Sequence, residues 1–332
     1  MSKWIDKKEK MAHIGGKVCI YGTHGTGKST LAGTWPRICL VDAEDGNAYY
    51  LRDNENILKV METTSASEVQ EALDELSDEE FLDLFDTVTI DSGTKLYENM
   101  QAAAYEIVEK RARKQKAKGK GAGIDMDDLN LSQRDWGHIK RWNQQLATTY
   151  ILLSHMGKWN VVTSHEKEIT KDFKKANGET ERIVIGYRPD LAKKAEHDFD
   201  IVIRTYIEET PDGEIKFMCK IDKDRTKVTK RGDIIENPTF DIWREKWEST
   251  KKLGVKKLDM SDDVEKSSKK MTSEDEALQE MVSDFKEKMK SLEKTDQTKV
   301  VKKLKELGIN DPTKTNDIDG MKEVIEFIEA LG

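Results

Sequence analysis

One segment constrains this chain more than any other: Gly22-Thr23-His24-Gly25-Thr26-Gly27-Lys28-Ser29, a complete match to the pattern GxxxxGK[ST]. An apolar run, Val18–Ile20, leads into it, and Ser29–Ala32 can begin a helix, which is the setting that the pattern requires. The glycines let backbone N–H groups turn inward around a phosphate at a helix N-terminus, where the dipole favours negative charge. We therefore expect a nucleotide-binding loop; the competing interpretation is a chance glycine-rich turn.

Each polar position of this loop has an expected task. Lys28 would reach the β- and γ-phosphates of ATP, and the Ser29 hydroxyl would ligate Mg²⁺. A second metal ligand is expected at the end of a neighbouring strand, and Thr87-Val88-Thr89-Ile90 ends in Asp91. The alternative is a plain strand that ends in a capping aspartate. The residues predicted to contact the nucleotide are Gly22, Thr23, His24, Gly25, Thr26, Gly27, Lys28, Ser29 and Thr30.

Hydrolysis also needs a carboxylate that orients water. The residue after Asp91 is Ser92 and not Glu, so this group has to come from elsewhere. Glu44 is the best candidate, because it follows the strand Ile38–Val41 and can reach the γ-phosphate in a wound sheet. Its rivals are Asp42 and Asp45, and a loop that only contacts solvent is the alternative.

Hydrophobic periodicity predicts the fold class. Up to about residue 247, short β-branched runs alternate with helical stretches, notably 94–117 and 133–156, which favours a wound, largely parallel α/β sheet. The last two runs flank Pro211-Asp212-Gly213 and predict an antiparallel hairpin at the sheet edge. The expected strands are Lys17–Tyr21, Ile38–Val41, Ile57–Met61, Thr87–Ile90, Asn160–Thr163, Ile201–Ile207 and Ile215–Ile221.

The C-terminal part has a different composition. Residues 1–247 read as the α/β core, and 248–272, rich in Lys, acidic residues, Ser and Thr, read as a flexible linker. Residues 273–332 carry three apolar stripes at helical spacing, with Ser273 and Glu276 in capping-box positions. They predict a small all-α unit.

Charge and cysteine content narrow the class of protein. The chain has 332 residues, 56 Lys or Arg against 64 Asp or Glu, and a net charge of −8. It contains no run of about 20 apolar residues, the length of a membrane span. Three scattered cysteines exclude a disulfide scaffold. We expect a cytoplasmic protein that does not enter a membrane.

Taken together, GTHGTGKST, LVDAEDG, VTIDS and VVTSHEK resemble the phage-encoded RecA-like ATPases of the Sak single-strand recombinase group, over about residues 15–245. The resemblance implies a RecA-like fold, a phage origin, ATP with Mg²⁺, and head-to-tail assembly into a filament or ring. It also implies a polar sensor at the end of the strand that follows the metal aspartate. His165 takes this position, which is not a histidine in RecA itself, and the alternative is an ordinary histidine at a strand end. A basic residue of the neighbouring subunit would complete each site, and Lys223 and Arg225 are the candidates; the alternative for both is hairpin surface charge.

The resemblance also implies single-stranded DNA as a partner. Residues 110–120, KRARKQKAKGK, carry seven Lys or Arg and no acid, and glycines at 119, 121 and 123 predict a mobile loop; the alternative is a solvated helix end. A second candidate is the segment 167–182 after His165. Stacking aromatics would have to come from Tyr105, Trp136 or Trp159, although core positions are the simpler interpretation for them. The predicted DNA contacts are Arg111, Arg113, Lys114, Lys116, Lys118, Lys120, Lys171, Lys174 and Lys175.

Three functions compete. The first is an ATP-dependent recombinase or annealing ATPase that binds single-stranded DNA as an oligomer. The second is a regulatory or assembly NTPase that acts through protein partners, for which DNA is incidental. The third is a small-molecule kinase, for which the Lys-dominated, glycine-flanked stretch is a poor lid. The C-terminal helices could bind a single-strand-binding protein, cap the oligomer or simply solubilise it.

Overall fold

The computed structural model describes residues 11–44, 46, 52–119, 125–126, 129–175, 179–255, 278–279, 281–313, 315 and 317–331. Contacts within the chain divide it into two units, Met1–Leu258 and Asp259–Gly332. The first unit contains two buried apolar clusters and the second contains one.

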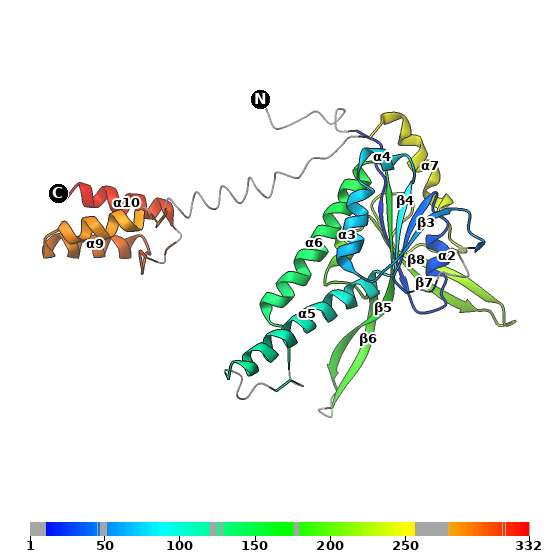
Figure 1. The fold of residues 1–332 in the computed structure, drawn as a ribbon, viewed down its shortest axis with the longest axis horizontal. Helices are drawn as coiled ribbons and strands as arrows, with labels where there is room; N and C mark the ends of the chain where they lie inside the picture. The colour runs from blue at the N-terminus through cyan, green and yellow to red at the C-terminus, as the bar shows by residue number, and fades with distance from the viewer. Residues whose placement is uncertain are drawn as a thin grey trace. The chain divides into compact units, whose positions relative to one another are not determined.

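A nine-stranded sheet forms the centre of the first unit (Figure 1). The strand order is β3-β2-β4-β5-β1-β7-β8-β9, and β6 pairs with the outer half of β5. The strands from β3 to β7 in this order are parallel, whereas β6, β8 and β9 pair antiparallel. This confirms the predicted wound α/β fold. The strands are β1 (Lys17–Gly22), β2 (Ile38–Asp42), β3 (Ile57–Glu62), β4 (Thr87–Asp91), β5 (Trp159–Lys174), β6 (Thr180–Pro189), β7 (Ile201–Glu209), β8 (Ile215–Asp224) and β9 (Ile234–Glu236).

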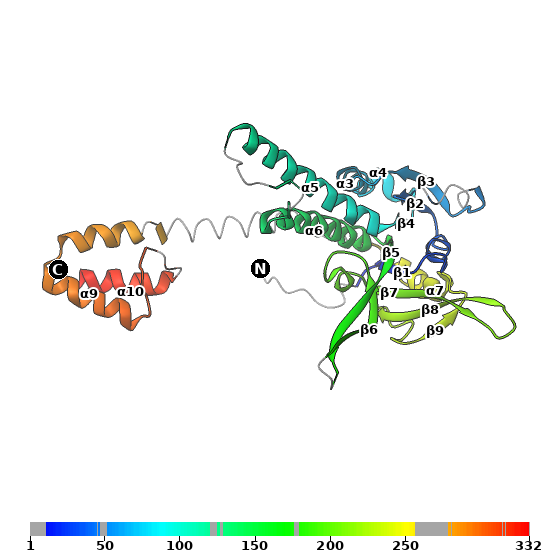
Figure 2. The ribbon, with the colours of Figure 1, turned by 90° about the horizontal axis from the view of Figure 1, so that it is seen from below.

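Helices cover both faces of this sheet (Figure 2). One face packs against α3 (Ala66–Glu75), α5 (Gly93–Ala117) and α6 (Gln133–His155), with α4 (Glu79–Leu82) beside α3. The other face packs against α2 (Lys28–Ala32) and α7 (Asp241–Thr250). Its core is a group of aromatic rings whose centroids lie 5.4–6.4 Å apart: Trp35, Trp159, Phe240, Trp243 and Trp247. Short 3₁₀ turns follow at η2 (Ala195–His197) and η3 (Lys251–Leu253).

Capping residues fix where the two long helices begin. Ser92 caps α5 by accepting a hydrogen bond from the Lys95 backbone N–H, and it directly follows Asp91. Ser132 and Asp135 form a reciprocal capping box at the start of α6. The first cap makes α5 start at the carboxyl edge of the sheet, where Asp91 lies. Both predicted helices are confirmed.

Two strands were not predicted, and one was predicted too short. β5 continues past Thr163 to Lys174 and returns as β6, so the segment after His165 is a long antiparallel arm and not a loop. Most of its side chains are exposed on both faces, which removes the alternation that marks a half-buried strand in sequence. The β7–β8 hairpin is confirmed, but β9 pairs outside it and occupies the sheet edge.

The second unit consists of helices around its own core. Residues 281–291 are helical and precede α9 (Lys294–Glu306) and α10 (Ile318–Glu329). The three helices bury Phe285, Val300, Leu304, Ile309, Met321, Val324 and Ile328. This confirms an all-α C-terminal unit; Ser273 and Glu276 lie outside the described residues. The predicted boundary at residue 247 falls within α7. Trp247 itself packs into the aromatic group and so belongs to the core of the first unit.

Candidate nucleotide-binding site

The loop after β1 has a conformation that only glycine adopts readily. Gly25 and Gly27 have φ angles of 71° and 83°, in the left-handed region. A Cβ at Gly22 would collide with the backbone carbonyl of Thr205 on β7. The glycines at these three positions of the motif are therefore required by the backbone and by its packing.

Side chains of the loop fold it back on itself. Thr26 Oγ1 donates to the Thr23 carbonyl at 2.8 Å and lies 2.8 Å from Thr205 Oγ1. Lys28 Nζ donates to the same Thr23 carbonyl at 2.7 Å, so its ammonium lies over the loop. Burial lowers the pKa of Lys28, while the carboxylates of Asp91, Glu44 and Glu166 act in the opposite direction. A phosphate in the loop would give this ammonium a stronger partner than a carbonyl.

Asp91 lies beside Ser29, as the metal prediction requires. Ser29 Oγ donates to Asp91 Oδ2 at 2.6 Å, and Thr163 on β5 donates to the other carboxylate oxygen. This convergence follows from strand order, because β5 lies between β1 and β4 and both of these strands end beside the part of β5 that contains Thr163. Asp91 is buried. A hydroxyl and a carboxylate are oxygen donors of the kind that Mg²⁺ accepts beside phosphate and water.

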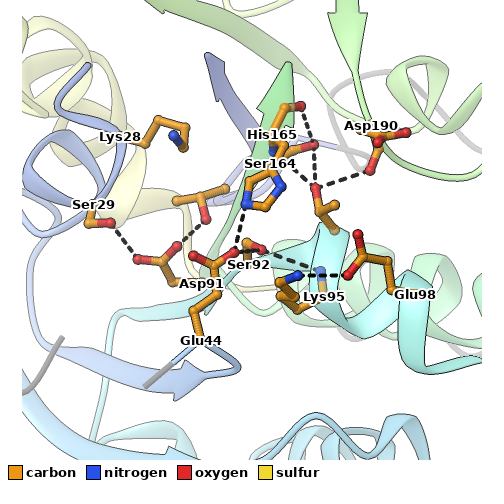
Figure 3. A network of polar contacts seen from close by, with 12 residues as sticks. Lys28, Ser29, Glu44, Asp91, Ser92, Lys95, Glu98, Ser164, His165 and Asp190 are labelled. Atoms are coloured by element: carbon orange, nitrogen blue, oxygen red, sulfur yellow. Dashed lines mark hydrogen bonds and ion pairs between the residues drawn. The ribbon is translucent and has the colours of Figure 1, made fainter. Parts of the chain in front are cut away.

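Glu44 reaches this site from the loop after β2. Its Oε1 accepts hydrogen bonds from Ser92 Oγ and from His165 Nε2, the latter at 2.8 Å (Figure 3). Among the residues that the structure describes, its Oε2 has no hydrogen-bond donor. Of the rivals, Asp42 is buried and its Oδ1 accepts the Glu44 backbone N–H at 3.1 Å, so it shapes the loop. Asp45 lies outside the described residues.

His165 lies next to the phosphate loop, opposite Gly22 in the parallel register of β1 and β5. Its backbone N–H donates to Thr94 Oγ1 at 2.9 Å, and Thr94 in turn donates to the Asp190 carbonyl at 3.0 Å. These bonds hold its backbone while the imidazole bridges to Glu44 (Figure 3). The expectation that His165 ends its strand is wrong, because β5 continues for nine residues beyond it, to Lys174.

The first basic stretch is helical over most of its length, which agrees with the predicted helix 94–117 and with the helix-end alternative, and not with the mobile loop. α5 extends to Ala117, so Arg111, Arg113, Lys114 and Lys116 are helical, and a lone buried position, Ala112, faces the protein. Arg111 pairs with Asp135 of α6 at 2.9 Å and Arg113 with Glu109 at 3.1 Å. A helix forms here because the segment lacks any breaker before Gly119. Lys120 lies outside the described residues.

Two aromatics near this helical end are exposed, contrary to the core interpretation. Tyr105 on α5 is 41% exposed and Trp136 on α6 is 44% exposed, whereas Trp159 is buried. The Arg111–Asp135 ion pair places Trp136 in the neighbourhood of the basic stretch. The helix pair α5 and α6 thus carries both exposed aromatic rings and the cations of the basic stretch.

The remaining candidates lie away from the phosphate loop. Lys171 and Lys174 are on the β5–β6 arm, and Lys175 follows directly, paired with Glu181 at 3.1 Å. Lys223 and Arg225 lie where β8 pairs with the start of β7, at the amino edge of the parallel strands. Lys223 Nζ donates to the Glu196 and His197 carbonyls, each at 3.0 Å, and Arg225 contacts Asp200. Within this chain neither cation approaches Lys28.

Sequence reasoning missed two hydroxyl residues of the site. Ser92 stands out in the sequence only for not being Glu, yet it hydrogen-bonds Glu44. Thr163, in the middle of a buried strand run, hydrogen-bonds Asp91. Both lie within two residues of a predicted site residue: Ser92 directly follows β4, and Thr163 lies in β5 one position past the pair Ile90–Val162 at the end of β4. That position is the only signal that could have singled them out.

Comparison with known proteins gives a family match. The AAA domain family matches residues 14–233, more than half of the 332-residue chain and including Lys28, Glu44, Asp91 and His165. Among solved structures, the chain is similar to the flagellar accessory protein FlaH from Methanocaldococcus jannaschii, at 12% sequence identity and a TM-score of 0.36, covering 70% of this chain and 90% of that chain. No match was found among the curated proteins. No helix of the described residues is long and apolar enough to span a membrane.

Proposed function

The chain belongs to the AAA domain family and is thus a P-loop ATPase, and we propose that single-stranded DNA stimulates its ATP hydrolysis during DNA recombination or annealing. The observation that carries the ATPase part is the convergence of Glu44 on the Ser29–Asp91 pair. A nucleotide-binding loop alone would also suit a switch or a kinase. Glu44 hydrogen-bonds Ser92, the residue after Asp91, and so puts a carboxylate beside this centre, as hydrolysis requires.

Magnesium is the expected metal. Ser29 Oγ and Asp91 Oδ2, 2.6 Å apart, would hold the ion and its water shell, together with phosphate oxygens. The bound ion would supply charge neutralisation at the β- and γ-phosphates. Thr163 orients the Asp91 carboxylate through the second oxygen.

Lys28, Glu44 and His165 each have a separate role in the proposed hydrolysis of ATP. Lys28 exchanges the Thr23 carbonyl for the γ-phosphate, and the loop amides hold the phosphate chain. Glu44 orients a water molecule and takes its proton as the water oxygen bonds to the γ-phosphorus. The bond from that phosphorus to the β–γ bridging oxygen breaks, and ADP leaves with the electron pair. His165, hydrogen-bonded to Glu44, changes its contacts when the γ-phosphate is present.

The DNA part of the proposal rests on α5 and α6. The exposed rings of Trp136 and Tyr105 accompany the cations of residues 110–118, which is the combination used to bind single strands. The β5–β6 arm, with Lys171, Lys174 and Lys175, is a second contact, and it leaves the sheet directly after His165. We place this activity in a Sak-type phage recombinase that acts in the cytoplasm.

Assembly completes the proposal. Head-to-tail oligomers would bring a neighbour's Lys223 or Arg225 to each site, and the C-terminal helices would recruit a single-strand-binding protein. The other candidate is a regulatory NTPase that acts through the same helices, whose separate core suits a recruitment unit. No described feature favours a kinase.

ATP hydrolysis with and without single-stranded DNA tests the proposal. Wild type should hydrolyse ATP faster with DNA, and Lys28→Ala should abolish turnover because the γ-phosphate loses its ammonium. Glu44→Gln should bind ATP with little change and hydrolyse it roughly 100-fold or more slowly. Turnover that depends on Lys28 but ignores DNA would favour the regulatory NTPase. Normal turnover in Glu44→Gln would remove Glu44 from the mechanism.

A further inference from the structure

We propose that Phe217 and Ile207 form the platform on which the base of the bound nucleotide stacks, and that this platform accepts purines without distinguishing adenine from guanine. The inference rests on the proposed ATP site, to which it adds the base-binding part. The observation behind it is that these two apolar side chains are exposed beside the phosphate loop. The hydrolysis mechanism uses neither of them.

The metal pair gives the direction of the bound nucleotide. Ser29, Asp91, Glu44 and His165 gather on the side of β1 occupied by β5 and β4, so the γ-phosphate end lies there. The base is at the opposite end of the phosphate chain. On the other side of β1 the sheet continues with β7 and β8. The nucleoside is therefore expected over the β7–β8 hairpin.

This hairpin extends beyond the phosphate loop. β1 ends at Gly22, which lies opposite Thr205, while β7 continues to Glu209 and β8 returns from Ile215 (Figure 1). The added length forms a wall next to the loop. When the phosphates of a nucleotide occupy the loop, its base would lie against this wall.

One face of the wall is apolar and begins beneath the phosphate loop. Three cross-strand pairs follow one another on this face: Ile203–Ile221, Thr205–Cys219 and Ile207–Phe217. The first two pairs are buried, and Leu31 and Ala32 of α2 belong to the same cluster. The third pair has no such cover: Ile207 is 41% exposed and Phe217 is 43% exposed. The buried row thus continues into an exposed platform.

The ring of Phe217 abuts the loop itself. Its Cδ1 lies 3.4 Å from the place that a Cβ on Gly27 would occupy. Gly27 directly precedes Lys28, so the platform and the phosphate-binding residues are continuous. A ligand with a flat ring joined to a triphosphate fits this continuity, because the same molecule can occupy both parts.

The chemistry of the platform determines its selectivity. A base stacked on an aromatic ring gains affinity whatever its edge groups, since every base has a π-face. Discrimination between bases needs hydrogen bonds to those edges. The platform offers a phenyl ring and an aliphatic side chain, neither of which donates or accepts. We therefore expect ATP and GTP to bind with dissociation constants within about threefold of each other.

Equilibrium binding by the full chain tests this proposal, with ATP, GTP and inorganic tripolyphosphate as ligands in the presence of Mg²⁺. Phe217→Ala should weaken ATP and GTP by about 5- to 100-fold and leave tripolyphosphate unchanged. Phe217→Trp should retain ATP binding, since it preserves the ring. Ile234→Ala is the matched control, because Ile234 is exposed on β9 but pairs with Lys220 and so faces the other side.

The binding results distinguish a failure of the proposed base platform from a failure of the proposed ATP site. Unchanged ATP affinity in Phe217→Ala would overturn the platform and leave the phosphate site intact. An equal loss for ATP and tripolyphosphate would also overturn it, because the ring would then only support the loop. A preference of wild type beyond tenfold for one purine would contradict the lack of selectivity. Failure of wild type to bind tripolyphosphate and ATP alike would instead refute the proposed ATP site.

Discussion

At the scale of single residues, the site depends on hydroxyl groups that orient carboxylates. Asp91 accepts from Ser29 and Thr163, and Glu44 accepts from Ser92. Each carboxylate is thereby fixed in direction by hydroxyl donors. Such fixed, charged oxygens suit a site that receives a metal ion and a water molecule, because little reorganisation is needed when they arrive.

His13 is a buried histidine whose titration should make the stability of the first unit depend on pH. The imidazole is buried, its Nδ1 lies 2.8 Å from Thr250 Oγ1, and it packs 5.5 Å from the Trp247 ring. Burial lowers the pKa of His13 below 6.5, helped by Lys251 and Lys158 and opposed by Asp86. As the pH falls below 6.5, the unfolded chain protonates His13 before the folded chain does. The free energy of unfolding should therefore decrease in that range.

Urea unfolding at pH 7.5 and pH 5.5 measures this effect. The decrease between the two pH values should be larger in wild type than in His13→Asn, which cannot titrate. His138→Asn is the control, since His138 is exposed on α6. An identical pH dependence in wild type and His13→Asn would exclude His13 as a contributor.

The site residues differ in how far sequence could predict them. Lys28, Ser29 and Asp91 follow from short patterns at strand ends, and the parallel sheet brings them together. Glu44 was predicted because it follows the neighbouring strand. Thr163 could not be assigned, because its role depends on β5 being inserted between β1 and β4. Phe217 could not be assigned either, because it approaches Gly27 only through the length of the hairpin.

At the scale of elements, α5 and α6 project from the sheet and carry the basic stretch as a rigid helical surface (Figure 2). The sequence predicted a helix over 94–117 and, for 110–120, either a mobile loop flanked by glycines or a solvated helix end; the structure describes a helix as far as Ala117. Helix propensity extends the helix to Ala117, because Lys, Arg, Gln and Ala are all good helix formers. The surface is thus formed before any ligand binds. DNA binding should cost little ordering entropy along this helix.

Trp136→Ala tests this helical surface. Loss of one stacking ring should weaken single-stranded DNA binding by about fivefold or more. Replacing Lys114, Lys116, Lys118 and Lys120 with Gln should reduce the slope of log affinity against log salt concentration by about 0.7 for each phosphate that the protein no longer neutralises. Trp142→Ala is the control, since Trp142 is 38% exposed but lies six residues further along α6. Fluorescence anisotropy over a salt series measures both quantities, and an unchanged slope would remove these lysines from the DNA site.

At the scale of the whole molecule, the two units have separate cores and so separate stabilities. A helical unit of this size has a modest core, for which a few kcal/mol of stability is typical. Phe285 is the aromatic residue buried in the described core of the second unit. Among the buried side chains of that described core it is the largest.

Phe285→Ala should therefore unfold the second unit, at a cost of about 3–5 kcal/mol, and leave ATP hydrolysis by the first unit unchanged. Hydrogen exchange resolved by peptide measures the loss of protection over 281–331. Val301→Ala is the control, since Val301 is 45% exposed on α9. A parallel loss of protection in the strands around Asp91 would contradict the independence of the two units.

The continuity of β5 has a mechanical consequence. The strand runs unbroken from the centre of the sheet through His165 to Lys174, and at roughly 3.3 Å per residue its outer part is about 30 Å long. A rotation of about 5° at His165 would move the far end by about 2.5 Å, since the strand is stiffened by pairing with β6. If His165 changes its contacts with the γ-phosphate, as proposed above, the arm would transmit that change outward as a displacement of this size near Lys171 and Lys174.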